Sequence, residues 1–126
     1  MKKVPDKYRG KKEYSLVYCR ILQAARQGQT IVYGDIAKIM GLPPSGHHMA
    51  SEVGQILGEI SEDEHVNGRP MLTAVVVSVD GMPGQGFFTC ARQLGKLHED
   101  SRDAERHFWE SEKAAVFETW RDAEGN

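Results

Sequence analysis

Long hydrophobic runs are missing from this sequence. The longest apolar stretch, Leu72–Val77, falls far short of the roughly 20 residues that cross a bilayer. The first residues, Met1–Pro5, are basic and lead into polar residues rather than into the apolar core of a secretory signal. We therefore expect no membrane partner and a cytoplasmic location.

Cysteine is also scarce, since the chain has only Cys19 and Cys90 and no Cys-x-x-Cys spacing. This count excludes a disulfide framework and a cysteine-based structural zinc site. His47 and His48 are adjacent, and adjacent residues on a helix point about 100° apart, so they rarely share one metal ion. We therefore expect no metal site and no cofactor.

The chain has 126 residues, of which 40% are hydrophobic and 27% charged, the balance of one globular domain. We expect a basic N-terminal arm at residues 1–12, a folded domain at 13–121 and a tail at 122–126. Residues 1–30 contain eight Lys and Arg against two Asp and Glu, whereas residues 99–126 contain four against nine. The arm is either a solvated segment or one that neutralises phosphates. The acidic end is either a solvated face or a partner for the arm of a second copy.

Hydrophobic spacing predicts three helices in the first half of the chain. Apolar residues from Tyr14 to Ala25 recur at the spacing of an amphipathic helix, and Gly28 ends it. A short extended link at 30–33 leads to a second helix around 36–40, which Gly41–Gly46 terminates. The third helix covers Met49 to Ile60, and an acidic loop is expected from Ser61 to Gly68.

The second half predicts a strand, a turn and a last helix. Met71–Val79 is rich in β-branched residues, Asp80-Gly81 is a turn signal, and the glycine-rich stretch to Gly86 is typical of a hairpin tip. Ser101 to about Arg121 is expected to be helical. This order predicts a small α+β winged helix-turn-helix domain with an added C-terminal helix.

Four segments carry a resemblance to a known family. They are Val17–Leu22, Gly28–Ala37, Gly41–Pro43 and Ala50–Gly58. Together they resemble the DNA-binding domain of alkylguanine-DNA alkyltransferases and their alkyltransferase-like relatives. The similarity continues weakly through Val75–Val77 and Asp80-Gly81.

The resemblance implies a role for Tyr33, which stands where the family has a tyrosine that presses on the DNA backbone. Ser51 stands at the position of the family's intercalating arginine, and serine is too small to fill the space of an extruded base. Pro70–Ala74 replaces the Pro-Cys-His-Arg segment and contains no thiol, imidazole or guanidinium. Alkyl transfer to cysteine is therefore not expected, and the chain is interpreted as a non-catalytic DNA-binding or regulatory protein.

The DNA-contacting residues would lie at the turn into the third helix and on its exposed face. This face contains no Lys or Arg, so counterion release would contribute little to affinity. The candidate contacts to double-stranded or single-stranded DNA are Tyr33, Ser45, His47, His48, Ser51 and Gln55.

Two alternatives remain open from the sequence. In the first, the aromatic residues of the second half form a surface for a protein partner or a homodimer: Phe87, Phe88, Trp109 and Trp120. In the second, Cys90 opens a short helix beside Arg92, which would lower its pKa and support an enzyme with a histidine partner. A small buried cysteine is the simpler interpretation of Cys90.

Overall fold

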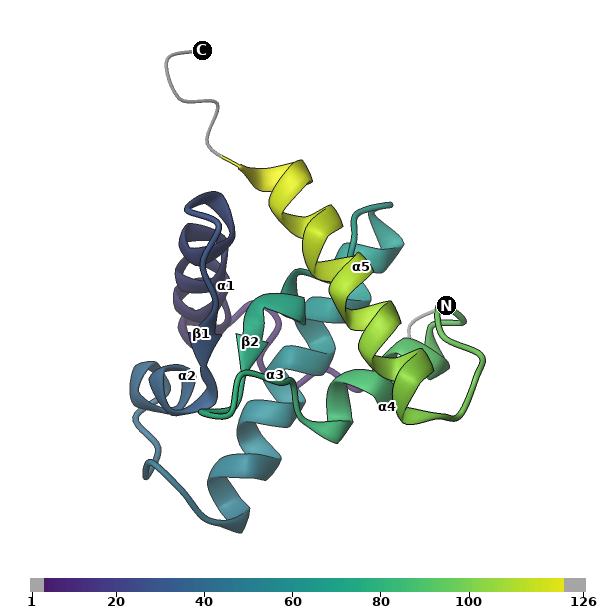
Figure 1. The fold of residues 1–126 in the computed structure, drawn as a ribbon. Coiled ribbons are helices and arrows are strands. Elements are labelled where there is room, and N and C mark those ends of the chain that lie inside the picture. The colour runs from purple at the N-terminus through teal and green to yellow at the C-terminus, as the bar shows by residue number, and fades with distance from the viewer. Residues whose placement is uncertain (1–3, 122–126) are drawn as a thin grey trace.

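The structure is a computed structural model that describes residues 4–121, and it is built mainly of helices (Figure 1). The elements run in the order α1 (Lys12–Arg26), β1 (Ile31–Val32), α2 (Tyr33–Ile39), α3 (His47–Val66), a short 3₁₀ helix η1 (Leu72–Val75), β2 (Val76–Val77), α4 (Gln85–Gln93) and α5 (Arg102–Trp120). None of the helices in this part of the chain has the length and hydrophobicity needed to span a membrane.

The first helix confirms the sequence pattern in detail. Val17, Ile21 and Ala24 are buried on one face of α1. Gly28 adopts φ +69°, and its N–H and that of Gln29 donate to the carbonyls of Ala25 and Ala24 at 3.1 and 2.9 Å. These bonds satisfy carbonyls that a helix end leaves unpaired, which is why α1 stops there.

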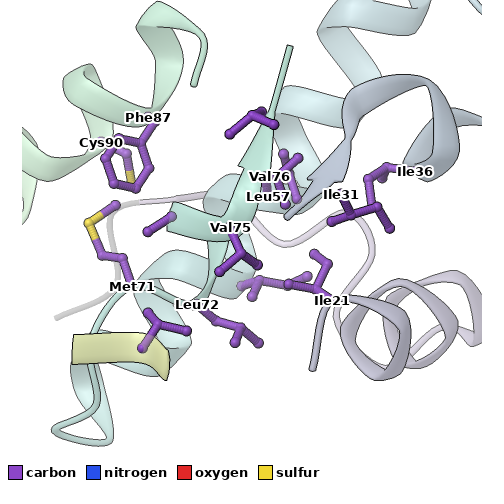
Figure 2. Close-up of a cluster of buried hydrophobic side chains, with 14 of the residues drawn as sticks. Ile21, Ile31, Ile36, Leu57, Met71, Leu72, Val75, Val76, Phe87 and Cys90 are labelled. Carbon is purple, nitrogen blue, oxygen red and sulfur yellow. The ribbon is translucent and has the colours of Figure 1, made fainter. Parts of the chain in front are cut away.

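A buried segment, η1 with β2, forms the centre of the core. All residues from Met71 to Val77 are buried, and η1 packs against α1, α3 and α5. Figure 2 shows Ile21, Ile31 and Ile36 at one end of this core and Met71, Phe87 and Cys90 at the other. Because the segment is enclosed on all sides, its side chains do not alternate between apolar and polar, and all of them except Thr73 are apolar.

The predicted α+β winged helix-turn-helix fold is wrong. The only sheet in residues 4–121 is a parallel pair, in which Ile31 faces Val76 and Val32 faces Val77, so the domain is mostly helical and has no antiparallel wing. The β-branched run 71–79 forms a strand only at β2, where β1 is available to pair with it. The part of the run before β2 is surrounded by helices and folds as η1. The expected wing tip leads into α4, whose Phe87, Phe88 and Ala91 are buried at helical spacing.

The third helix is longer than the sequence indicated. The segment expected to be an acidic loop continues α3 to Val66, and Glu62 and Glu64 within it are buried. These carboxylates have cationic partners, since Arg9 Nη2 lies 2.7 Å from Glu62 and Arg69 Nη2 lies 2.7 Å from Glu64. The sequence pattern predicted a loop because the cations that allow its charges to be buried, Arg9 and Arg69, lie outside the segment.

The last helix is confirmed, and it is fixed to the core by polar contacts. Ser101 caps α5 by accepting a hydrogen bond from the Ala104 N–H at 3.1 Å. Trp109 Nε1 donates to the Ala74 carbonyl at 2.8 Å, and Glu112 accepts from the Met71 N–H at 2.8 Å. Both bonds lie between α5 and the buried central segment, which they hold in register.

Candidate functional site

A cavity of about 550 Å³ lies between α3, α4 and the loop that follows β2. Val53, Leu57 and Phe87 form its buried apolar walls. Pro44, Ala50, Gly54, Val79 and Gly86 are exposed lining residues, so they mark its mouth. None of the described residues that line the cavity is charged, so it suits a neutral and largely apolar group.

Small residues on α3 create this space. Ala50, Gly54 and Gly58 recur at a spacing of four, which places them on one face of the helix, and all three line the cavity. A Cβ atom added at Gly54 would meet no atom of the described chain within 4 Å. Glycine disfavours a helix interior by about 1 kcal/mol relative to alanine. The sequence therefore retains glycine on α3 where a larger side chain would occupy the cavity.

Tyr33 is the one predicted DNA contact that lines the cavity. It is the first residue of α2, and its hydroxyl accepts a hydrogen bond from the Gly84 N–H at 2.6 Å. Burial raises the pKa of Tyr33, so the hydroxyl stays neutral. The bond ties α2 to the loop on the opposite side of the mouth.

The inner end of the cavity carries a small polar cluster. The hydroxyls of Ser61 and Thr73 lie 2.6 Å apart, and both residues are buried. Cys90 lines the cavity beside them. Burial raises the pKa of its thiol, and the hydrogen bond with Ser61 offsets this rise only in part. The alternative in which Cys90 opens a short helix is wrong, because α4 begins at Gln85 and Cys90 lies in its second turn. The thiol is therefore not activated by a helix N-terminus.

Four of the predicted contacts lie at the exposed beginning of α3 or in the loop before it. Ser45, His47, His48 and Ser51 are all exposed. In Figure 1 the first turns of α3 extend at the bottom of the molecule, away from the body of the domain. The mouth of the cavity lies at this end, since Ala50 and Gly54 belong to the same turns.

Gln55, the sixth predicted contact, is engaged by another segment. Its side-chain amide donates to the Pro5 carbonyl and to Glu59, each at 2.8 Å. Pro5 belongs to residues 4–10, which we call the strap, and the strap lies along α3. Gln55 is thus separated from the other predicted contacts and has a structural role.

Buried carboxylates of α3 hold the strap. Glu59 accepts hydrogen bonds from the N–H groups of Lys7, Tyr8 and Arg9 at 2.8–3.2 Å. The Arg9 guanidinium pairs with Glu62 at 2.7 Å and Asp63 at 3.0 Å, and its side chain is 11% exposed. The basic arm is therefore folded onto α3 from residue 4 onward, and Arg9 is not available to phosphates.

Lys7 and Tyr8, in the middle of the strap, hold it to an earlier turn of α3. The Lys7 ammonium lies 2.7 Å from Glu52, and the Tyr8 hydroxyl donates to the same carboxylate. The hydrogen bond from Lys7, and to a smaller extent the one from Tyr8, lowers the pKa of Glu52. Lys7 and Arg9 of the strap thus pair with three carboxylates of α3, namely Glu52, Glu62 and Asp63.

The aromatic residues invoked for a protein-binding surface are mostly internal. Phe87, Phe88 and Trp109 are buried in the core. Trp120 is partly buried, with the Arg69 guanidinium 5.7 Å from its ring. The structure therefore does not gather them on an exposed face.

Sequence reasoning did not identify the cavity or the strap. The glycine spacing on α3 was the available signal for the cavity, whereas the strap depends on contacts about 50 residues apart in the chain. Among residues 4–121 there is no group of three His, Cys, Asp or Glu side chains arranged to hold a metal ion. No protein-family model, curated protein or solved structure matches this chain, so its function has to be argued from the cavity and from α3.

Proposed function

We propose that this chain is a non-catalytic DNA-binding protein that presents the exposed beginning of α3 to the duplex and holds one unstacked base in the adjoining cavity. One observation carries the proposal: the apolar cavity opens at the same turns of α3 that extend from the domain. A base that leaves the stack there would exchange its neighbours for the walls formed by Val53, Leu57 and Phe87.

The chemistry of the cavity supports a base rather than a phosphate. Its described lining residues are uncharged, and its polar groups are hydroxyls and one thiol of raised pKa. Hydroxyls such as those of Ser61 and Thr73 both donate and accept hydrogen bonds, which suits the edge of a base. A thiol that stays protonated is a poor nucleophile, so retention of the base without covalent transfer is the favoured outcome.

The charge distribution predicts how the affinity depends on salt. α3 has no Lys or Arg, and the strap cations Lys7 and Arg9 pair with carboxylates. Few phosphates would therefore be neutralised, so the affinity should fall only shallowly with salt. For about two or three phosphate contacts, the slope of the logarithm of the binding constant against the logarithm of the salt concentration is about −2 to −3, at roughly −0.9 per contact. Discrimination would come from the base in the cavity.

The test is a fluorescence-anisotropy titration of two labelled duplexes that differ only in one unpaired base. Unstacking costs least where a base is already unpaired, so we expect at least tenfold tighter binding to the duplex that contains it. Gly54→Leu, which fills the cavity, should abolish this preference. The matched control is Ala114→Leu, which adds three apolar carbon atoms, against the four of Gly54→Leu, at an exposed position of α5. Equal affinity of the wild type for both duplexes, or no binding at low salt, would refute the proposal.

A further inference from the structure

The strap lies against the inner end of the cavity as well as along α3. Val4 and Cys90 both line a second hollow of about 450 Å³, and Cys90 also lines the main cavity. A Cβ added at Gly58, another residue of the main cavity, would contact Val4 Cγ1 at 3.7 Å. Val4 therefore packs where the two hollows approach each other, on the side opposite the mouth.

The contacts of the strap allow it to detach without disrupting the core. Its hydrogen bonds and ion pairs are concentrated on Glu52, Glu59, Glu62 and Asp63 of α3, and its apolar contacts are those of Val4 and the partly buried Tyr8 at the edge of the core. Glu59 and Glu62 are 0% and 2% exposed beneath the strap. Because the strap itself contributes to this burial, water would reach the carboxylates once it left, and ionised groups would not stay in an apolar environment. A seated and a released state are thus both physically accessible.

The ends of the strap match this interpretation. At its C-terminal end Gly10 adopts φ +81°, and the Lys11 N–H donates to the Tyr8 carbonyl at 2.9 Å, so a tight turn separates the strap from α1. At its other end the Val4 N–H donates to Glu62 at 3.1 Å. One cation, Arg9, connects Glu62, Asp63 and the Val4 carbonyl, which makes it the residue on which seating depends most.

We propose that the strap is a releasable rear wall of the cavity: Val4 closes it beside Gly58 and Cys90 when Arg9 is seated, and release of the strap joins the two hollows. A ligand too long for the main cavity alone is then admitted only in the released state. By linkage, such a ligand favours release to the same extent that release favours its binding. The inference does not depend on which ligand occupies the cavity.

The test measures access to Cys90 in the full chain, with Cys19→Ser present so that Cys90 is the only thiol. N-ethylmaleimide labelling is followed by mass spectrometry in the wild type, in Arg9→Gln and in Arg106→Gln. The last is the matched control, because Arg106 is exposed on α5. We expect at least a tenfold faster reaction in Arg9→Gln and no change in the control. Cleavage by trypsin after Lys7 should accelerate in parallel, since it reports strap release directly.

Two further variants determine the route of access. Gly54→Leu obstructs the mouth, so the acceleration by Arg9→Gln should persist when both changes are combined. Val4→Gly removes the closing side chain and keeps the ion pairs of Arg9, so it should also accelerate labelling if Arg9→Gln does not fold. The proposal is overturned if a folded Arg9→Gln or Val4→Gly labels at the wild-type rate, or if Gly54→Leu cancels the gain. No DNA enters this assay, so its result is independent of the proposed function.

Discussion

Filling the cavity from α3 should stabilise the protein and at the same time remove its proposed activity. Gly54 lies in the interior of α3, and an added Cβ meets no described atom within 4 Å. Gly54→Leu gains about 0.8 kcal/mol from helix propensity. A fully buried leucine contributes roughly 1.5–3 kcal/mol, and half of that is expected at the mouth. The sum, about 2 kcal/mol, raises the Tm of a domain of this size by roughly 6–10 °C.

The assay is thermal unfolding followed by far-UV circular dichroism, with DNA titration of the same samples. Gly28→Leu is the control, since it makes the same chemical change at φ +69°, where a side chain is strained by roughly 1–2 kcal/mol. We expect the Tm to rise for Gly54→Leu and to fall for Gly28→Leu. A Tm lowered by Gly54→Leu would show that the space beside α3 is filled, which would refute a cavity at this position.

Three further outcomes follow from particular contacts. Tyr33→Phe leaves the Gly84 N–H without its acceptor at 2.6 Å, so it should lower the free energy of unfolding by about 1–3 kcal/mol in urea denaturation; an unchanged midpoint would contradict a structural role for the hydroxyl. Ser51→Arg adds a cation at an exposed position of α3 and should tighten DNA binding while steepening the salt slope by about one phosphate contact; an unchanged slope would mean that this face does not meet DNA. Burial is the largest cause, and nearby carboxylates of α3 the next, that raise the pKa of Tyr8 and Tyr18 to about 12 and also raise the pKa of Tyr14. Because these folded-state pKa values exceed the unfolded value near 10, the three tyrosines contribute fully to stability below pH 10, and this contribution is lost as the pH rises towards 12 and above. The measurement is a titration of tyrosinate absorbance in the folded protein, and ionisation of these tyrosines near pH 10 would contradict the prediction.

The local pattern of the sequence was sufficient for the elements whose stability is local. The stripe from Tyr14 to Ala25 and the glycine after it predicted α1, because an amphipathic face and a positive-φ stop act within one helix. Apolar spacing likewise predicted the last helix from Ser101 onward, and its observed start at Arg102 is fixed locally, since the Ser101 hydroxyl accepts from the N–H three residues later.

Features that depend on distant partners required the tertiary structure. The run 71–79 has high β propensity, yet it forms η1 and a two-residue strand because β1 is its only paired neighbour in residues 4–121 and helices enclose the remainder. The acidic segment after Ile60 is helical because Arg9 and Arg69 neutralise it from outside.

The candidate site divides in the same way. The exposure of Ser45, His47, His48 and Ser51 was predictable, because a loop and the polar first turns of the helix that follows it face solvent whatever packs behind them. The assignment of Gln55 to the same surface depended on what covers α3, and only the fold brings Pro5 there. The cavity is likewise a property of packing: the sequence contains Gly54 and Gly58, but whether a missing side chain leaves a space is decided by the walls that α4 and the loop after β2 place opposite.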